Sequence, residues 1–180
     1  MRAVKGLLGA VMVGGVLFAA NTAVGASAPM TGGAVQVWVT PSPAGNGGGK
    51  VMVTGALADY GTGQTTNAAG KADTKGTYKR LLLKHGTIFI NATKFVKANN
   101  NANPTMYNKS DCSAVIDFSA PAPILSGTGA YAGITGSLTL TARFAVILPK
   151  TKTGACNESN SAIPLDQYGV VTGSGTIKFS

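Results

Sequence analysis

The chain has 180 residues, of which 25 are glycine and only 12% are charged. Abundant glycine and sparse charge argue against a helical bundle and favour an all-β domain with many turns. The formal net charge is +9, or +7 without Arg2 and Lys5. This charge attracts anionic envelope polymers or lipid head groups, whereas no compact basic and aromatic motif indicates a nucleic-acid partner.

The first 26 residues have the three parts of a secretory signal peptide. Arg2 and Lys5 form a basic start, 6–20 is an uncharged, largely apolar run, and small residues follow as far as Ala26. The apolar run is shorter than the ~20 residues of a membrane-spanning helix, so we expect cleavage after Ala26 rather than a retained anchor. The sequence therefore predicts an exported protein, secreted or held in the cell envelope, with 27–33 as a short linker and 34–180 as one domain.

Seven segments alternate between apolar and polar residues, a pattern typical of strands buried on one face. They are 34–40, 50–60, 77–83, 86–95, 113–120, 137–148 and 166–180. Residues 41–49 and 61–76 are predicted to be loops, and 93–101 is the one candidate for a short helix. The prolines of Pro121-Ala122-Pro123 are expected to end the strand before them.

The stretch 127–136, GTGAYAGITG, is predicted to be a tight corner that leads into the strand 137–148. Its glycines permit sharp bends and close backbone approach. A flexible linker would have little use for Tyr131 and Ile134, which are large enough to plug the end of a barrel or a corner of a sheet. The residues assigned to the corner are Gly127, Gly129, Tyr131, Gly133 and Gly136.

This corner, the alternating strand after it and the final VTGSGTIKF at 171–179 resemble the small β-barrel shared by allene oxide cyclases and plant dirigent proteins. The chain looks most like the secreted bacterial, actinobacterial-type proteins that carry such a barrel. The resemblance covers 34–180 and implies a single antiparallel barrel of about eight strands, with a wide hairpin at 61–76. It also implies a possible homo-oligomer. No residue matches the catalytic or ligand-contacting positions of either plant family.

The two cysteines, Cys112 and Cys156, are expected to form one disulfide, the simplest fate of an isolated pair in an exported chain. Closing a loop of this length would stabilise the fold by about 4 kcal/mol. The alternative, a metal site or a reactive thiol pair, lacks nearby cysteine or histidine companions. We therefore assign no metal and no cofactor.

Asp117 and Arg143 are the candidates for chemistry. Aspartate is depleted in strands, and inside a barrel Asp117 could serve as an acid, a base or a ligand contact. On an outer face it would meet solvent or pair with Arg143 or a lysine, and we favour this structural role. His85 falls in a hairpin turn, where we expect an exposed side chain without a chemical task. Trp38 is interpreted as a packing residue or a rim aromatic rather than a ligand platform.

Two functions follow from these observations. The first is a secreted, non-catalytic barrel that binds a small apolar ligand or a component of the cell envelope, because no nucleophile and base, metal cluster or phosphate loop stands out. The alternative is an isomerase or cyclase of the allene oxide cyclase type, which depends on confinement and one or two polar groups. An open interior lined by Asp117 or Arg143 would favour the enzyme or a ligand binder. An interior filled by apolar side chains would favour a module that acts through its surface.

Overall fold

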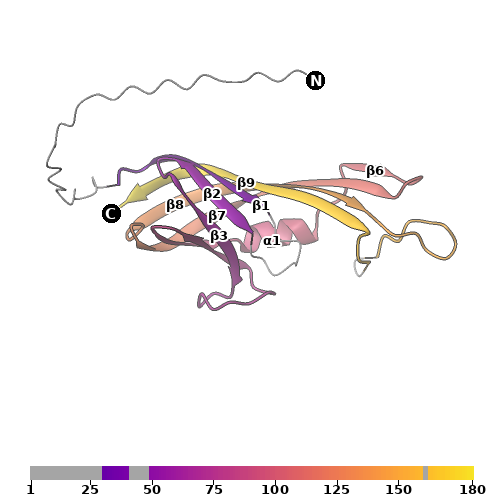
Figure 1. Cartoon of the computed structure of the whole chain (residues 1–180), viewed down its shortest axis with the longest axis horizontal. Coiled ribbons are helices and arrows are strands. Elements are labelled where there is room, and N and C mark those ends of the chain that lie inside the picture. The colour runs from indigo at the N-terminus through magenta and orange to yellow at the C-terminus, as the bar shows by residue number, and fades with distance from the viewer. Residues whose placement is uncertain (1–29, 41–48, 160–161) are drawn as a thin grey trace, which may run out of the picture.

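The computed structural model describes residues 30–40, 49–159 and 162–180, which form nine strands and one short helix (Figure 1). The predicted signal peptide, the linker residues 27–29 and the loop residues 41–48 lie outside the described residues. The elements are β1 (Gly33–Thr40), β2 (Lys50–Gly55), β3 (Asp59–Thr66), β4 (Tyr78–Leu83), β5 (Gly86–Asn91), α1 (Thr93–Asn100), β6 (Met106–Asn108), β7 (Ser113–Gly129), β8 (Ile134–Ile147) and β9 (Asp166–Phe179).

Eight of these strands close into an antiparallel β-barrel. The sheet order is β5-β4-β3-β2-β1-β9-β8-β7-β6, and a further pairing of β5 with β7 joins the two sides. Strand β6 is left outside the closed ring, where it pairs with the beginning of β7. The structure thus confirms the all-β fold class and the single small barrel of about eight strands that the sequence predicts.

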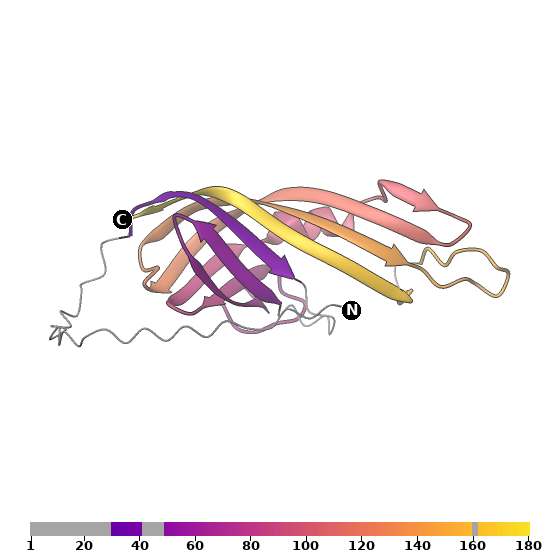
Figure 2. The same cartoon turned by 45° about the horizontal axis from the view of Figure 1, so that its top comes forward.

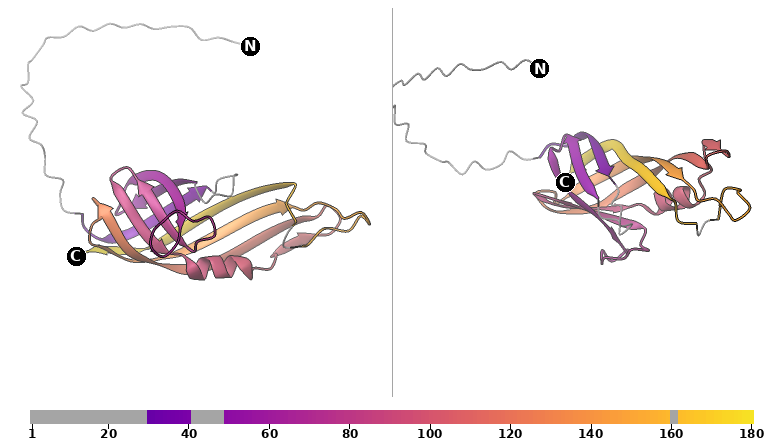
Figure 3. Two further views of the ribbon diagram at one scale, coloured as in Figure 1. Left: turned by 90° about the horizontal axis from the view of Figure 1, so that it is seen from below. Right: turned by 45° about the vertical axis from the view of Figure 1, so that its right-hand side comes forward.

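Three strands continue beyond the barrel. Strand β1 pairs with β9 only as far as Val171, yet β7, β8 and β9 run on together past this point, with β6 at the edge (Figure 2). We call the described residues of 106–117 and 143–170 the extension, and the rest of the described residues the barrel body. Helix α1 contacts β7 where the two parts meet, as the view from below shows (Figure 3), and Phe95 of α1 packs on Phe118 of β7 with ring centroids 5.0 Å apart.

The barrel interior is packed with apolar side chains. Alternate residues of each strand point inward because successive side chains of a strand face opposite ways. Tyr131 and Ile134 of the corner are each 1% exposed and pack with the other core residues. The largest contributors besides these two are Val35, Val37, Val51, Val53, Leu57, Leu81, Leu83, Ile88, Ile90, Ile124, Leu138, Leu140 and Ile177.

The segment 50–60, for which the sequence suggests one strand with a bend or bulge at Gly55, holds β2 and the start of β3, because the chain turns after Gly55. Gly55 has a φ of +91°, and a Cβ atom there would lie 2.4 Å from the carbonyl oxygen of Ala34. The turn after Gly55 separates β2 from β3, which pair with each other. Strand β3 extends into the segment predicted as a polar loop, since β2 and β4 supply backbone partners for its small polar residues. The wide hairpin implied by the resemblance is the β3–β4 hairpin.

The prolines do not end the strand that holds Asp117, as the sequence suggested they would. Strand β7 continues through Pro121 and Pro123 to Gly129 while pairing with β8. On its other side β7 pairs with β6 as far as Val115 and with β5 from Ile124. The prolines lie in the interval between these two neighbours, where their missing N–H groups are tolerated.

The predicted strand 86–95 is shorter than expected, since β5 ends at Asn91 and the candidate helix begins at Thr93. The remaining predicted strands are confirmed. Leu138, Leu140 and Ala142 are buried, whereas Ser137, Thr139 and Thr141 are exposed. This alternation gives the barrel an apolar interior and a hydroxyl-rich outer surface.

Candidate functional site

Asp117 and Arg143 lie outside the barrel, on the first row of the extension. They are cross-strand partners of β7 and β8, with 3.5 Å between Asp117 Oδ1 and Arg143 Nε. The Asp117 carboxylate also accepts a 3.0 Å hydrogen bond from Thr105 Oγ1. The Arg143 side chain is 65% exposed and that of Asp117 is 37% exposed. This geometry is the surface pair that the sequence interpretation favoured, and it lines no cavity inside the barrel.

The two cysteines form a disulfide, as predicted. Cys112, which is buried, lies just before β7, and Cys156 lies in the loop between β8 and β9, with 5.4 Å between their Cα atoms. A 2.7 Å hydrogen bond from the Tyr107 hydroxyl to Glu158 also joins β6 to this loop. The disulfide therefore fastens the far end of the extension.

A buried carboxylate, Asp59, holds one end of the barrel together. Its Oδ2 atom accepts hydrogen bonds from the hydroxyl of Tyr131 and, at 3.0 Å, from the backbone N–H of His85. The same oxygen is 3.1 Å from His85 Nδ1, and Oδ1 accepts the backbone N–H of Tyr60 at 2.7 Å. Asp59 thus joins the corner to the β4–β5 turn. The His85 side chain is 55% exposed, as predicted, but its link to Asp59 was missed because 26 residues separate them.

The electrostatics of this group favour a structural role. Burial alone would raise the pKa of Asp59, but the hydrogen bonds from Tyr131, His85 and Tyr60 outweigh it and lower the pKa to about 2. Burial and the adjacent Asp59 raise the pKa of the Tyr131 hydroxyl above its usual range. Near neutral pH Asp59 stays ionised and Tyr131 stays protonated, so neither is poised to exchange a proton.

The opposite end of β4 carries a second polar contact of the barrel. Lys79 lies on the same face as Leu81, and its Nζ atom donates a 2.7 Å hydrogen bond to Thr65 Oγ1 of β3. Burial lowers the pKa of the Lys79 amine. With Asp59 at one end and Lys79 at the other, polar contacts flank the apolar interior at both ends of β4.

Exposed apolar side chains gather on the outer face, in a row across three strands. Trp38 of β1 is paired with Met52 of β2, and Met52 is paired with Tyr60 of β3. Their exposed fractions are 43%, 50% and 62%. The three side chains line a hollow of about 600 Å³ together with Lys50 and Val170.

On the other side of Trp38 the same outer face is covered by hydroxyl and amide groups. Trp38 is paired with Thr172, which continues the row to Thr141 and Ser119. The hydroxyls of Thr141 and Ser119 are 2.8 Å apart. The neighbouring row consists of Gln36, Ser174 and Thr139. A smaller hollow of about 170 Å³ is lined by Trp38 and by both rows except Ser119, so Trp38 separates an apolar surface from a hydroxylic one.

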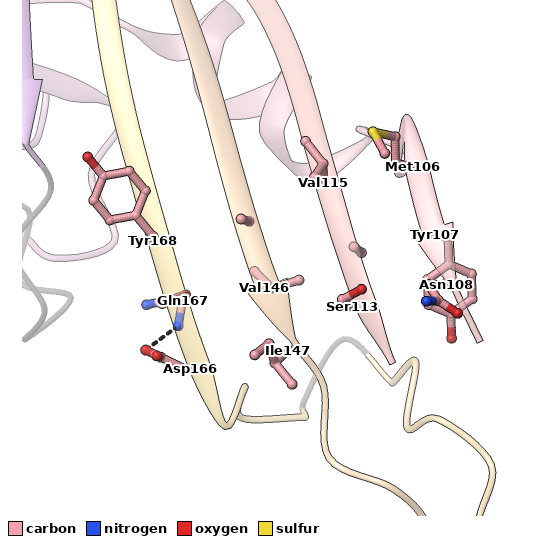
Figure 4. Close-up of a pocket in the computed structure, with 12 residues that line it drawn as sticks. Met106, Tyr107, Asn108, Ser113, Val115, Val146, Ile147, Asp166, Gln167 and Tyr168 are labelled. Atoms are coloured by element: carbon pink, nitrogen blue, oxygen red, sulfur yellow. Dashed lines mark hydrogen bonds between the residues drawn. The ribbon is translucent and has the colours of Figure 1, made fainter. Parts of the chain in front are cut away.

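A second apolar trough lies on the extension. Its row crosses four strands, from Tyr168 of β9 through Ala145 and Val115 to Met106 of β6. Figure 4 shows Tyr168 and Met106 on opposite sides of this trough, with Val115 and Ile147 between them. Its volume is about 330 Å³, and Tyr168 and Met106 are 72% and 64% exposed.

Net charge is divided unequally between the two parts of the molecule. The extension holds four basic residues (Lys109, Arg143, Lys150, Lys152) and four acidic ones (Asp111, Asp117, Glu158, Asp166). The described barrel body holds nine basic residues and only two acidic ones, Asp59 and Asp73. Since Asp59 is buried and hydrogen-bonded, the surface of the barrel body is strongly cationic.

The fold and the surface together define a small closed barrel with a sheet extension and an outward-facing aromatic row. No protein-family model matches the chain, and no curated protein or solved structure matches it. Within the described ranges no helix is long and apolar enough to cross a membrane. Those same ranges contain no group of three or more His, Cys, Asp or Glu side chains arranged to hold a metal ion.

Proposed function

We propose that this chain is an exported, non-catalytic binding protein that holds a component of the cell envelope on the outer face of its barrel. The observation that carries the proposal is the distribution of apolar side chains. The barrel interior is filled by buried aliphatic residues and Tyr131, whereas Trp38, Met52 and Tyr60 stand exposed in one row outside. Rows of exposed large apolar side chains mark interaction sites on proteins.

We also propose the cellular setting and the relationship that the sequence suggests. The basic and apolar start of the chain supports export, and the disulfide fits an oxidising compartment outside the cytosol. The closed barrel with a glycine corner supports membership of the secreted bacterial group with allene-oxide-cyclase-like or dirigent-like barrels. A fold of this kind carries many functions, so the binding role rests on the surface rather than on the relationship.

The test is co-sedimentation with envelopes isolated from the producing organism, separated into wall and membrane fractions. Wild-type protein is expected to sediment with one fraction. Replacing Met52 and Tyr60 by serine should release most of it, because apolar contact area is lost from the row. The matched control is Leu125→Ser, an exposed apolar residue of β7 that is 47% exposed outside this row. Protein that stays in the supernatant with every fraction would contradict the proposal.

The trough of the extension supports a second candidate, a small apolar ligand. About 330 Å³ lined by Met106, Val115, Ala145 and Tyr168 has the size and character of a site for a modest apolar molecule. Native mass spectrometry of protein purified from its own secretion medium should then detect a small adduct that is lost on denaturation. The isomerase or cyclase alternative is tested by incubating the compound found as the adduct with the protein. If the protein isomerises it, liquid chromatography will show a product with the same mass and a different retention time.

A further inference from the structure

We infer that the outer face around Trp38 binds an acidic polysaccharide, meaning a chain of sugar rings that carries carboxylate or phosphate groups. This inference rests on the proposed function and names the class of envelope component. Two properties of the surface favour this partner: the chemistry of the side chains around Trp38 and the positive charge of the barrel body.

The side chains around Trp38 match the two chemical faces of a sugar ring. The C–H groups of a pyranose pack against an exposed aromatic ring, and Trp38 and Tyr60 offer such rings on neighbouring strands. Sugar hydroxyls require donors and acceptors, which Ser and Thr hydroxyls and the Gln36 amide supply in both roles. Thr172 is the direct cross-strand partner of Trp38, and the rows from Thr172 to Ser119 and from Gln36 to Thr139 continue from there across β9, β8 and β7.

The same arrangement argues against a lipid bilayer as the partner. If this face entered the hydrocarbon of a bilayer, the hydroxyls beside Trp38 would lose their hydrogen bonds to water and gain no new partners. Each such group would add an unfavourable free energy of desolvation. The hydroxylic rows lie directly next to the aromatic row on the same sheet face, so the aromatic row cannot enter a membrane deeply without them. A hydrated sugar polymer can contact the aromatic row and hydrogen-bond the hydroxylic rows at the same time.

Charge complementarity indicates that the polymer is acidic. Lys50 lines the larger hollow, and Lys84 adjoins Tyr60 through a 3.1 Å hydrogen bond from its backbone N–H to the Tyr60 carbonyl. Of the described carboxylates near this face, Asp59 is buried and Asp117 is paired with Arg143. The excess of basic residues therefore lies on the part of the molecule that carries the sugar-binding groups.

The experiment uses the fact that Trp38 is the only tryptophan of the chain, so that its fluorescence reports on this face alone. The probes are alginate as a polyuronate, phosphomannan as a phosphorylated glycan, neutral dextran, polyacrylate as a polyanion without sugar rings, and phosphatidylglycerol vesicles. We expect saturable emission changes with alginate or phosphomannan, and an affinity that falls as sodium chloride is raised, because exposed charges are screened.

Variants are compared by affinity electrophoresis, which does not depend on the tryptophan signal. Trp38→Ala should weaken binding about tenfold or more, as truncation of an aromatic anchor does, while Trp38→Phe should retain most of it. Lys50→Gln and Lys84→Gln should each weaken it severalfold. The matched controls are Ile163→Ala, at an exposed apolar residue of the extension, and Lys152→Gln, which should leave binding unchanged. Circular dichroism and thermal unfolding verify that each variant is folded.

Four outcomes would overturn the inference. They are equal binding to polyacrylate without an effect of Trp38→Ala, equal binding to dextran, binding to the vesicles in place of the glycans, and binding to none of the probes. Co-sedimentation with isolated envelopes in any of these cases would leave the proposed function in place and reject only the polysaccharide. If instead the protein binds alginate saturably but does not sediment with isolated envelopes, the proposed function is rejected and the polysaccharide inference remains.

Discussion

Asp59 is the residue on which the end of the barrel depends, because hydrogen bonds from three other residues converge on its carboxylate. Tyr131, His85 and Tyr60 all donate to it, and its side chain is 1% exposed. These partners come from the corner, the β4–β5 turn and β3. One carboxylate thus connects parts of the chain that are distant in sequence.

Replacement of Asp59 by asparagine should lower the free energy of unfolding by about 3 kcal/mol, since buried N–H and O–H donors lose a charged acceptor. The matched control is Asp117→Asn, which breaks the exposed pair with Arg143 and should cost less than about 1 kcal/mol. Urea denaturation of the three proteins at neutral pH measures both values. Equal losses in the two variants would show that the buried group is no more important than a surface ion pair.

The same residue predicts a pH dependence with a defined sign. The pKa of Asp59 is about 2 in the folded chain, against an ordinary value of 3.8. Its ionised form is stabilised by folding, so this contribution is complete above the ordinary pKa and disappears as the pH falls through about 2. The shift corresponds to about 2 kcal/mol. The stability gap between wild-type protein and Asp59→Asn should therefore narrow by about that amount between about pH 5 and pH 2, and a constant gap would contradict the assignment.

The residue scale is also where sequence analysis is weakest. Asp117 and Arg143 are conspicuous in the sequence because each is a charge within a predicted strand, but both lie on the surface of the extension. Asp59 is inconspicuous, because its importance comes from Tyr131, 72 positions away. The sequence alone predicts Trp38 to be a packing residue or a rim aromatic rather than a ligand platform. Its position between an apolar and a hydroxylic row, on which the polysaccharide proposal depends, follows from pairings of β1 with two different strands. Local patterns do not contain these long-range neighbours.

At the scale of elements, the corner between β7 and β8 shows why glycine is required at particular positions. A Cβ atom on Gly127 would lie 2.1 Å from the carbonyl oxygen of Tyr131 and 2.6 Å from Cγ2 of Ile134. Gly129 has a φ of +62°, the left-handed region that glycine adopts without strain. The tight backbone here brings Tyr131 under the barrel end.

Gly127→Ala should therefore destabilise the protein by about 3 kcal/mol, because the added methyl group forces apart a packed backbone. Gly154→Ala is the control, since Gly154 has a φ of +85° but nothing within 4 Å of its Cβ position, and only backbone strain of about 1 kcal/mol is expected. Thermal unfolding at neutral pH compares the two. A loss for Gly127→Ala no larger than for the control would show that the corner has room to open.

Strands were predictable where apolar and polar residues alternate, and uncertain where they do not. β1, β4, β8 and β9 follow their patterns closely. β3 has almost no apolar alternation, and its strand structure comes from pairing with β2 and β4. The strands of the extension were predicted, but not that they project beyond the barrel, which depends on β1 pairing with β9 only as far as Val171. The continuation of β7 past its prolines was also missed, because it depends on which neighbours the prolines face. Tertiary pairing therefore overrides local preference in these elements.

At the scale of the whole molecule, the barrel body and the extension are held by different means. The barrel is a closed ring of hydrogen-bonded strands around an apolar core. The extension has three long strands, the edge strand β6 and the disulfide between Cys112 and Cys156. The two parts are therefore expected to differ in local stability.

Replacing both cysteines by serine should loosen the extension selectively. Hydrogen exchange should accelerate for the amides of the extension, while those of β1 to β5 stay protected, since their partners lie within the ring. Mass spectrometry of peptides from exchanged protein measures this directly. The same acceleration in every strand would mean that barrel and extension open as one cooperative unit.

The place of β9 in the sheet determines when this protein can fold. The final strand lies between β1 and β8, and the pairing of Gly33 with Ile177 joins residues at opposite ends of the described chain. During synthesis, β1 and β8 both lack a neighbour until the last fourteen-residue strand has emerged. Ring closure is therefore a late, non-local event with a large entropic cost, which slows folding. The nascent chain remains open, with its aliphatic strands accessible to chaperones, until β9 has been made.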